Sequence, residues 1–452
     1  MERDRLDFGN GKIGSLFRAM FFPTLIGMAF NSALNICDGM FVGHGVGSNA
    51  LAAINIVAPL FLICAGVGLM FGIGASVIGG IRLAEGNVKS ARIIMTQAYI
   101  AGAVIFGAVI IGSLLFTRPL LYMLGCSPAL EQLASEYLLW LLPGLVFFYL
   151  QCAGMMLIRL DGSPRYAMSV QIVAAVLNIF LDWYMVFPLG MGIKGASMAT
   201  SISCIVAGLM VLAYFLFFSG KLKFYRLRLS AKSLRLSLRN VGYMAKIGFA
   251  TFIAELAIGV MMVTGNYMFL EYLGEDGVAA FSVGCYLFPL IFSVSNAVAQ
   301  SSQPIISYNY GAGRKDRVRQ ALNLALLTAV ASGAAMSAGM WAGSGVLAGI
   351  FLDRSAAAYG IAAAGLPLLG LSALPFAINI TFIGYYQSCE RAVRSIIYML
   401  LRGIVFMVPG FIFLPAMVDV PGLWLAIPVS ELLTLIIIAS AYMLNRRTAY
   451  RL

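Results

Sequence analysis

Charged residues are scarce in this chain, and their scarcity excludes a water-soluble fold. Of the 452 residues, 11% are charged and 61% are hydrophobic, and the mean hydropathy is +0.93. About a quarter of the residues of a soluble protein are charged. Uncharged stretches recur that are long enough to cross the ~30 Å hydrocarbon core of a bilayer, which takes about 20 residues of helix. Because backbone in lipid must satisfy its own hydrogen bonds, the sequence predicts an all-α integral membrane protein.

Residue patterns for catalysis and metal binding are missing as well. The single histidine, His44, has no triad or metal partners in the sequence, and no DDxxD, HExxH or GxSxG motif is present. These absences argue against a membrane enzyme such as a prenyl transferase or an intramembrane protease. The seven cysteines are scattered without CxxC spacing, so neither a disulfide framework nor a zinc site is expected. We expect a protein that is not an enzyme and that needs no cofactor.

The apolar runs, divided at glycine and proline, predict twelve membrane spans. They lie at roughly 16–38, 51–79, 94–116, 134–158, 166–187, 195–218, 244–270, 278–306, 321–350, 361–387, 395–415 and 422–444. Placing both termini in the cytoplasm leaves only Arg118, Lys194 and Arg354 outside, as the positive-inside rule requires. The net charge of +12 follows from this topology and implies no nucleic acid partner. We expect a multi-pass protein of the cell (inner) membrane with cytoplasmic termini.

The longest polar break, 221–246, carries eight basic residues and separates six spans from six. An offset of 227 residues aligns loop ends of the two parts, for example Gly47 with Gly274 and Gly195 with Gly422. The sequence therefore predicts an N-terminal six-helix lobe at 1–220, a basic cytoplasmic linker at 221–246 and a C-terminal six-helix lobe at 247–452. Two pseudo-symmetric lobes around a cleft are typical of transporters that work by alternating access.

Four segments are recognisable together: DGMFVGHGVGSNALAAINI, IRLDGSPRYAM, LNIFLDWYMVFPLGMGIKGASMATSIS and SYNYGAGRKDRVR. They resemble the multidrug and toxic compound extrusion (MATE) family. The resemblance implies twelve helices in two lobes and antiport of H⁺ or Na⁺ against lipophilic or cationic organic compounds such as drugs. It places the ion-coupling site at Asp38, Asn178, Asp182 and Thr200, and a bend of the first helix at Pro23. One departure is the absence of a proline near the start of the seventh helix, where this chain has Gly248-Phe249-Ala250.

The charges inside the spans support such a site independently of the resemblance. Asn178 and Asp182 are four residues apart, so they share one helix face. If Asp38 and Asp182 face each other at low dielectric, either one carboxyl holds a proton or a cation lies between them. Oxygen ligands from Asp38, Asn178, Asp182 and Thr200 suit Na⁺ as well, so the coupling ion is left open. The alternative is that Asp38 caps its helix among lipid headgroups and Asp182 bonds a neighbouring helix.

A second set of intramembrane charges lies in the C-terminal half. Glu255, Arg402 and Glu431 all lie at midplane depth, and a charge in lipid is costly unless it is paired. One reading is a structural ion pair between Arg402 and Glu431. Glu255 would then be available to attract a cationic substrate.

Two cargo classes fit this architecture. The first is small organic, often cationic, compounds, whose export would confer drug resistance. The alternative is a lipid-linked saccharide flippase of the same superfamily, whose cavity would need clustered arginines to hold a pyrophosphate. This sequence has one arginine within a span, Arg402. No partner chain is implied, so we expect a monomer in the lipid bilayer.

Overall fold

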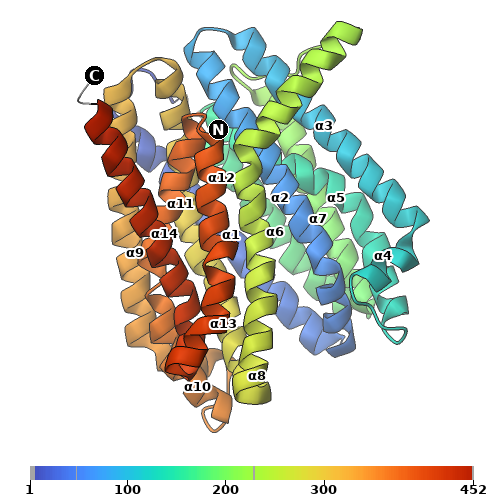
Figure 1. The fold of residues 1–452 in the computed structure, drawn as a ribbon. Helices are drawn as coiled ribbons and strands as arrows, with labels where there is room; N and C mark the ends of the chain where they lie inside the picture. The colour runs from blue at the N-terminus through green and yellow to red at the C-terminus, as the bar shows by residue number, and fades with distance from the viewer. Residues whose placement is uncertain (1–5, 47, 228–229, 450–452) are drawn as a thin grey trace. The chain divides into compact units, whose positions relative to one another are not determined.

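The computed structural model describes residues 6–46, 48–227 and 230–449, shown in Figure 1. Within these ranges, the side chains of residues 35–36, 38–40, 42–45, 48–49, 51–52 and 445–449 lie outside the description. All secondary structure in the described ranges is helical. The helices are α1 (Ile13–Gly45), α2 (Ser48–Ala84), α3 (Val88–Leu115), α4 (Thr117–Met123), α5 (Glu131–Leu160), α6 (Pro164–Val186), α7 (Gly192–Ala213), η1 (Tyr214–Phe218), α8 (Ala231–Gly311), α9 (Lys315–Phe351), α10 (Ala357–Gly370), α11 (Ala373–Ser388), α12 (Ala392–Leu400), η2 (Leu401–Val405), α13 (Met407–Val418) and α14 (Val420–Ala449).

The described helices confirm the prediction of twelve spans. Ten of them are long and apolar enough to cross a bilayer, and the pair α10 and α11, bent by 43°, supplies an eleventh span. Helix α8 has 81 residues and would be about 120 Å long if straight, far more than a bilayer requires. Its backbone leaves the helical region at Gly274, where φ is 65° and ψ is −154°. Glycine tolerates this conformation, so α8 folds back there and supplies two spans.

The chain forms two compact units. Unit 1 consists of Met1–Glu255 together with Pro304–Val318, and unit 2 consists of Leu256–Gln303 together with Arg319–Leu452. Each unit thus contains a part of α8. The lobes at 1–220 and 247–452 and the linker at 221–246 stay a prediction from the sequence duplication.

Glycines let the backbones of α2 and α8 touch within unit 1. A Cβ atom on Gly248 would lie 1.9 Å from the carbonyl oxygen of Met70, and one on Gly74 would lie 2.1 Å from that of Met244. Lipid provides no hydrophobic force between helices, so close van der Waals packing at small residues holds such crossings together. A methyl group at either glycine would push the two helices apart.

Two arginines that follow α8 hold the N-terminal loop against unit 1. Arg314 Nη1 donates to Gly9 O (2.5 Å), and Arg317 Nη2 donates to Gly11 O (2.7 Å) and Phe8 O (3.1 Å). Asn309 Nδ2 also donates to Phe8 O (3.1 Å) and its Oδ1 accepts from Arg317 Nε (2.8 Å). We call these contacts the N-terminal clasp. They are part of unit 1 although their two sides are about 300 residues apart in the sequence.

Candidate functional site

Helices α6 and α7 bring three of the predicted ion-coupling residues together. Asn178 and Asp182 lie one turn apart on α6 and are 1% and 0% exposed. Thr200 lies on α7, which packs against α6, and its Oγ1 accepts a hydrogen bond from Asn178 Nδ2 at 3.4 Å. The Thr200 hydroxyl donates to Ala196 O (3.1 Å), so its lone pairs face Asn178. The packing of α6 against α7 thus places a buried carboxylate, an amide and a hydroxyl in one cluster, which we call the Asp182 cluster.

The amide of Asn178 links the other two members of this cluster. When the oxygen and nitrogen of this amide are exchanged, the bond to Thr200 Oγ1 is replaced by two others: Nδ2 donates to Asp182 Oδ2 (3.0 Å) and Oδ1 accepts from Thr200 N (3.3 Å). In this orientation the amide nitrogen faces an acceptor and the amide oxygen faces a donor. The cluster therefore offers carboxylate and neutral oxygen atoms inside a membrane span. Such a set can hold a proton on the carboxyl group or contribute oxygen ligands to a hard cation such as Na⁺.

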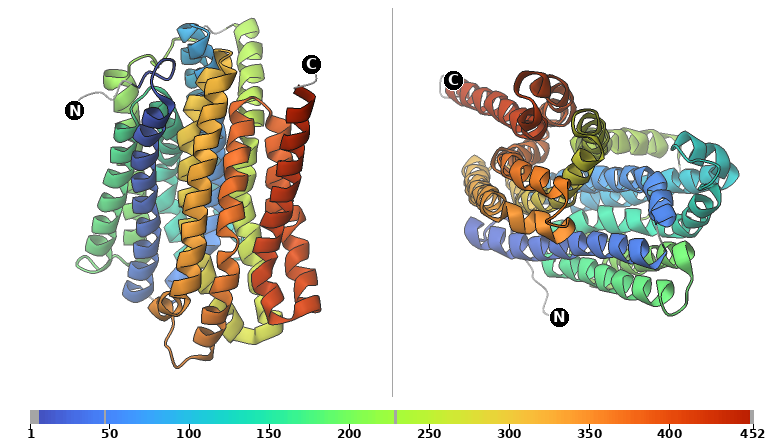
Figure 2. Two further views of the ribbon diagram at one scale, coloured as in Figure 1. Left: turned by 90° about the vertical axis from the view of Figure 1, so that its left-hand side faces the viewer. Right: turned by 90° about the horizontal axis from the view of Figure 1, so that it is seen from below.

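Helix α1 packs against α6 in the same unit, and both views in Figure 2 show α1 in dark blue beside α6 in green. A Cβ atom on Gly27 would lie 1.9 Å from Gln171 Oε1, so the two helices approach closely at this point. Pro23 is buried inside α1, which continues as one helix through it. Asp38 belongs to α1, but its side chain lies outside the described residues. Its membership of the Asp182 cluster and the bending role of Pro23 stay predictions.

Glu255 lies on α8, is the last residue of the first segment of unit 1, and is almost fully buried. A Cβ atom on Gly66 of α2 would contact its Cβ atom at 3.5 Å and the ring of Phe252 at 2.8 Å. Its surroundings on this side are therefore the backbone of α2 and an aromatic ring. Arg402 and Glu431 belong to unit 2.

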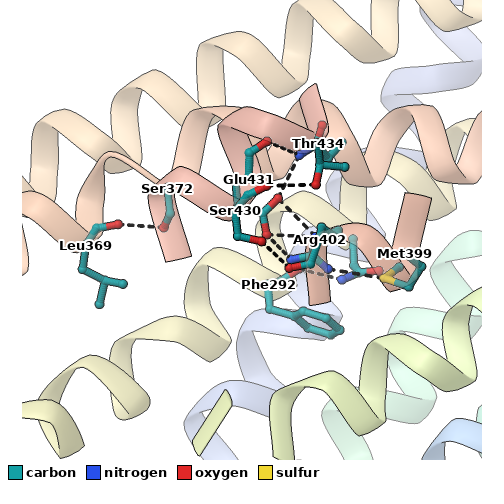
Figure 3. Close-up of polar contacts among 10 residues, drawn as sticks. Phe292, Leu369, Ser372, Met399, Arg402, Ser430, Glu431 and Thr434 are labelled. Carbon is teal, nitrogen blue, oxygen red and sulfur yellow. Dashed lines mark hydrogen bonds and ion pairs between the residues drawn. The ribbon is translucent and has the colours of Figure 1, made fainter. Parts of the chain in front are cut away.

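Arg402 and Glu431 form a buried ion pair in unit 2 (Figure 3). The side chains are 6% and 2% exposed. Arg402 Nη2 donates to Glu431 Oε1 (2.5 Å), and Arg402 Nε donates to Oε1 (2.9 Å) and Oε2 (3.1 Å). This is the forked geometry in which a guanidinium group binds a carboxylate most strongly. The pair joins the π-helical turn η2 to α14.

Three further residues complete this ion pair, and the sequence did not single them out. Asn379 of α11 donates through Nδ2 to Glu431 Oε2 (2.8 Å) and Glu431 O (2.8 Å), and the ring of Phe376 lies 4.2 Å from the Arg402 guanidinium carbon. Ser430 Oγ donates to Arg402 O (2.6 Å), so it holds the π-helical turn directly. A polar residue inside the apolar run of α11 was the available signal for Asn379.

No group of three or more His, Cys, Asp and Glu side chains in the described ranges is close enough to hold a metal ion. The Asp182 cluster contains one described carboxylate and two neutral oxygen donors. This composition suits a monovalent cation or a proton better than a transition metal, which takes nitrogen or sulfur ligands.

Comparison with known proteins identifies the family. A family model described as MatE matches residues 23–184 and again residues 250–412. The second match begins 227 residues after the first, which is the offset deduced from the sequence duplication. Together the two matches cover more than half of the chain.

Relatives and a solved structure agree with this match. The chain is 27% identical over 329 residues to a FAD transporter of Shewanella oneidensis, covering 72% of this chain and 71% of that protein. It is 25% identical over 394 residues to multidrug export protein MepA of Staphylococcus saprophyticus, covering 86% of each. A solved outward-facing conformation of a multidrug resistance MATE family transporter of the MOP superfamily has a TM-score of 0.91 at 20% identity, covering 100% of this chain and 99% of that one. The protein belongs to the MatE (MATE) family of multidrug and toxin efflux transporters.

Proposed function

We propose that this transporter exports lipophilic, often cationic, organic compounds by antiport with H⁺ or Na⁺. The observation that carries the proposal is the Asp182 cluster, in which a fully buried carboxylate lies beside the Asn178 amide and the Thr200 hydroxyl inside two membrane spans. An ionisable group in a membrane span is costly and is retained where an ion pathway needs it. The names of the MepA relatives support drug-like cargo, and the FAD transporter relative makes FAD a cargo to be tested.

Antiport follows from how this carboxylate can be neutralised. At low dielectric the Asp182 side chain is stable either as the neutral, protonated acid or as a carboxylate with a cation bound. A transporter that releases its cargo when it binds the proton or cation on one face, and releases the ion when it binds cargo on the other, therefore couples the two gradients. Asn178 and Thr200 orient the carboxylate and supply further oxygen atoms. The same oxygen atoms suit either H⁺ or Na⁺, so the coupling ion has to be identified by experiment.

The lipid-linked saccharide flippase is disfavoured by the ion pair of unit 2. A pyrophosphate needs positive charge that is not already neutralised. The guanidinium group of Arg402 is already bound by the Glu431 carboxylate through two nitrogen atoms. The one arginine predicted within a span is thereby committed to a partner inside the protein.

The test is efflux from proteoliposomes under an imposed pH or Na⁺ gradient, with ethidium and FAD as alternative cargoes. Asp182→Asn keeps the size of the side chain and removes its charge, so it should abolish gradient-driven efflux while the protein stays inserted. Asp316→Asn, at an exposed position near the start of α9, is the matched control and should behave as the wild type. Near-normal efflux by the Asp182 variant would show that this carboxylate is structural.

A second comparison separates the two sets of charges. We expect Asp38→Asn to eliminate gradient dependence for every cargo and Glu255→Gln to weaken only some cationic cargoes. Loss of one charge partner typically costs a few kcal/mol or less, about 2–5 when the pair is buried. Uncoupling by Glu255→Gln together with altered selectivity in Asp38→Asn would assign the lobes in the opposite way.

We also propose that both termini and the linker lie in the cytoplasm of a cell whose plasma (inner) membrane holds the protein. The observation behind this orientation is the concentration of Lys and Arg in alternate loops. A cysteine introduced at Ser233 should react with a membrane-permeant maleimide in intact cells and resist an impermeant one, with the wild type giving the background of its seven cysteines. Labelling by the impermeant reagent would reverse the topology.

A further inference from the structure

The first turns of α8 carry an exposed strip of positive charge beside exposed leucines. The basic side chains are Lys232, Arg235, Arg239 and Lys246, and we call them the basic stripe. At about 100° per residue they fall within an arc of about 60° on the helix surface. Figure 1 shows these turns, in yellow-green at the upper right, inclined to the turns of α8 that follow them.

Apolar side chains flank the basic stripe. Leu234 and Leu238, four residues apart, are 64% and 65% exposed, and each is followed directly by an arginine of the stripe. Leu236 on the other flank is exposed as well. An exposed leucine next to an arginine is unfavourable in water but suits the boundary between acyl chains and headgroups, where the leucine enters the apolar layer and the guanidinium group reaches the phosphates.

The opposite face of the same turns is fixed to α3. Gln97 Nε2 donates to Ser237 Oγ (2.8 Å), and Asn240 Nδ2 donates to Gln97 Oε1 (3.0 Å). Met244 and Ile247 on this face are fully buried. These contacts set the rotation of the helix about its axis, so the basic stripe points away from α3.

The chain that leads into α8 is also held in place. The carboxylate of Asp161 accepts hydrogen bonds from the backbone N–H groups of Gly220 (2.6 Å), Lys221 (2.9 Å) and Leu222 (2.9 Å). Tyr225 N donates to Thr96 Oγ1 (3.0 Å). The exposed Lys221, Lys223 and Arg226 of this segment therefore add positive charge next to an element of fixed orientation.

No side chain in the described part of the chain pairs with the basic stripe through a hydrogen bond or an ion pair. The stripe belongs to a helix that continues directly into a membrane span, so its charges lie near the level of the lipid headgroups. Arginine binds phosphate oxygens in forked geometry, and clusters of Lys and Arg beside a span attract anionic lipids.

We propose that the basic stripe with Leu234 and Leu238 is a binding surface for anionic phospholipid headgroups, which fix the inclined start of α8 on the bilayer. The occupant is the membrane that surrounds the protein. The inference concerns unit 1 alone and does not depend on the transported cargo.

The first experiment compares lipids that stay bound to the full-length protein. The purified protein is equilibrated with equal amounts of phosphatidylglycerol and phosphatidylcholine, and retained lipids are counted by native mass spectrometry. We expect the wild type to prefer phosphatidylglycerol. In the triple variant Lys232→Gln/Arg235→Gln/Arg239→Gln this preference should fall at least about fivefold, which is the effect of losing one basic residue near an anionic surface. Raising the salt concentration should weaken the wild-type preference.

The matched control removes the same charge from exposed positions outside the stripe, as Lys315→Gln/Arg319→Gln/Arg391→Gln. It should keep the wild-type preference. Equal retention of both lipids by the wild type, or equal loss in the two triple variants, would overturn the proposal. A wild-type dimer that the stripe variant converts to a monomer would make a second copy the occupant and would also overturn it.

A second measurement places the surface in the bilayer. Leu234→Trp adds a fluorophore beside Arg235, and the wild type supplies the signal of the four native tryptophans for subtraction. Brominated phosphatidylglycerol in vesicles should quench the added fluorescence more than brominated phosphatidylcholine does. A tryptophan at position 234 that neither lipid quenches, but that iodide in the buffer does, would show that the surface faces water.

Discussion

Replacing Glu431 by leucine would leave the guanidinium group of Arg402 buried without its carboxylate. Among the described residues, the guanidinium group would keep the ring of Phe376 at 4.2 Å and a weak contact to Met399 Sδ at 3.4 Å. Asn379 would lose its bond to the carboxylate but keep the backbone carbonyl of residue 431. Because a guanidinium group does not give up its proton, its charge stays buried. We expect the unfolding free energy to fall by about 3–5 kcal/mol, the cost of breaking a buried ion pair from one side.

Replacing Arg402 by methionine should cost less, at the lower end of the same range of about 3–5 kcal/mol. The isolated Glu431 carboxylate keeps the hydrogen bond from Asn379, so its loss of partners is smaller than that of Arg402. The double variant Arg402→Met/Glu431→Leu contains no unpaired charge, and substitutions of this kind are often neutral or stabilising. The losses of unfolding free energy seen in the two single variants should therefore largely disappear in the double variant. A double-mutant cycle should then give a coupling energy of several kcal/mol.

The cycle can be measured by SDS unfolding in mixed micelles, followed by circular dichroism and by tryptophan fluorescence. Arg82 and Glu85 form a control pair of the same chemistry at 2.8 Å with side chains 45% and 40% exposed. An exposed pair is worth less than about 1 kcal/mol, so its cycle should show little coupling. Single losses below about 1 kcal/mol at Arg402 and Glu431 that simply add in the double variant would refute the reasoning.

Three further predictions follow from unit 1. Gly248→Ala should destabilise the protein by about 1–3 kcal/mol in the same assay because its methyl group meets the backbone of α2, whereas Gly259→Ala, with open space around it, should not. Arg317→Met removes three hydrogen bonds of the N-terminal clasp and should raise hydrogen exchange in residues 8–16, while the exposed Lys315→Met should leave it unchanged. The hydrogen bond from the Asn10 side chain holds the pKa of Asp7 below its usual 3.8. The stability that this turn contributes is therefore present above pH 3.8 and is lost as the pH falls through the lowered pKa. Exchange in residues 6–12, corrected for intrinsic rates, should therefore rise in acid for the wild type but not for Asp7→Asn.

Each of these three has a contrary outcome. Equal stabilities of the Gly248 and Gly259 alanine variants would mean that α2 and α8 adjust at no cost. Equal exchange in the Arg317 and Lys315 variants would show that the clasp is not stabilising. An acid-induced rise that persists in the Asp7 variant would assign the pH dependence to another group.

The membrane spans could be predicted because bilayer thickness imposes a length on every apolar run. The break at Gly274 was implied by the two spans predicted on either side of it. The short helix α4 and the π-helical turns η1 and η2 were not predicted. They depend on local packing, as the bond from Ser430 to the carbonyl group of Arg402 shows for η2.

The candidate site divides in the same way. Residues four apart on one helix, such as Asn178 and Asp182, are necessarily close, and their neighbour Thr200 came from the family resemblance. The pairing of Arg402 with Glu431 could be proposed from depth alone, because an unpaired charge in lipid is so costly. Asn379 lies 52 residues from Glu431 in sequence, and no periodicity connects the two. Its place beside the carboxylate is determined by how α11 packs against α14.

The N-terminal clasp sets an order for the making of this protein. The ribosome delivers residues 8–11 first, yet the arginines that bind their carbonyl groups follow about 300 residues later. Until that time the carbonyl groups of residues 8, 9 and 11 lack these donors, and unit 1 is incomplete although its first six spans have already been synthesised. A chain that stops at the linker therefore lacks every donor that binds these carbonyl groups in the complete protein.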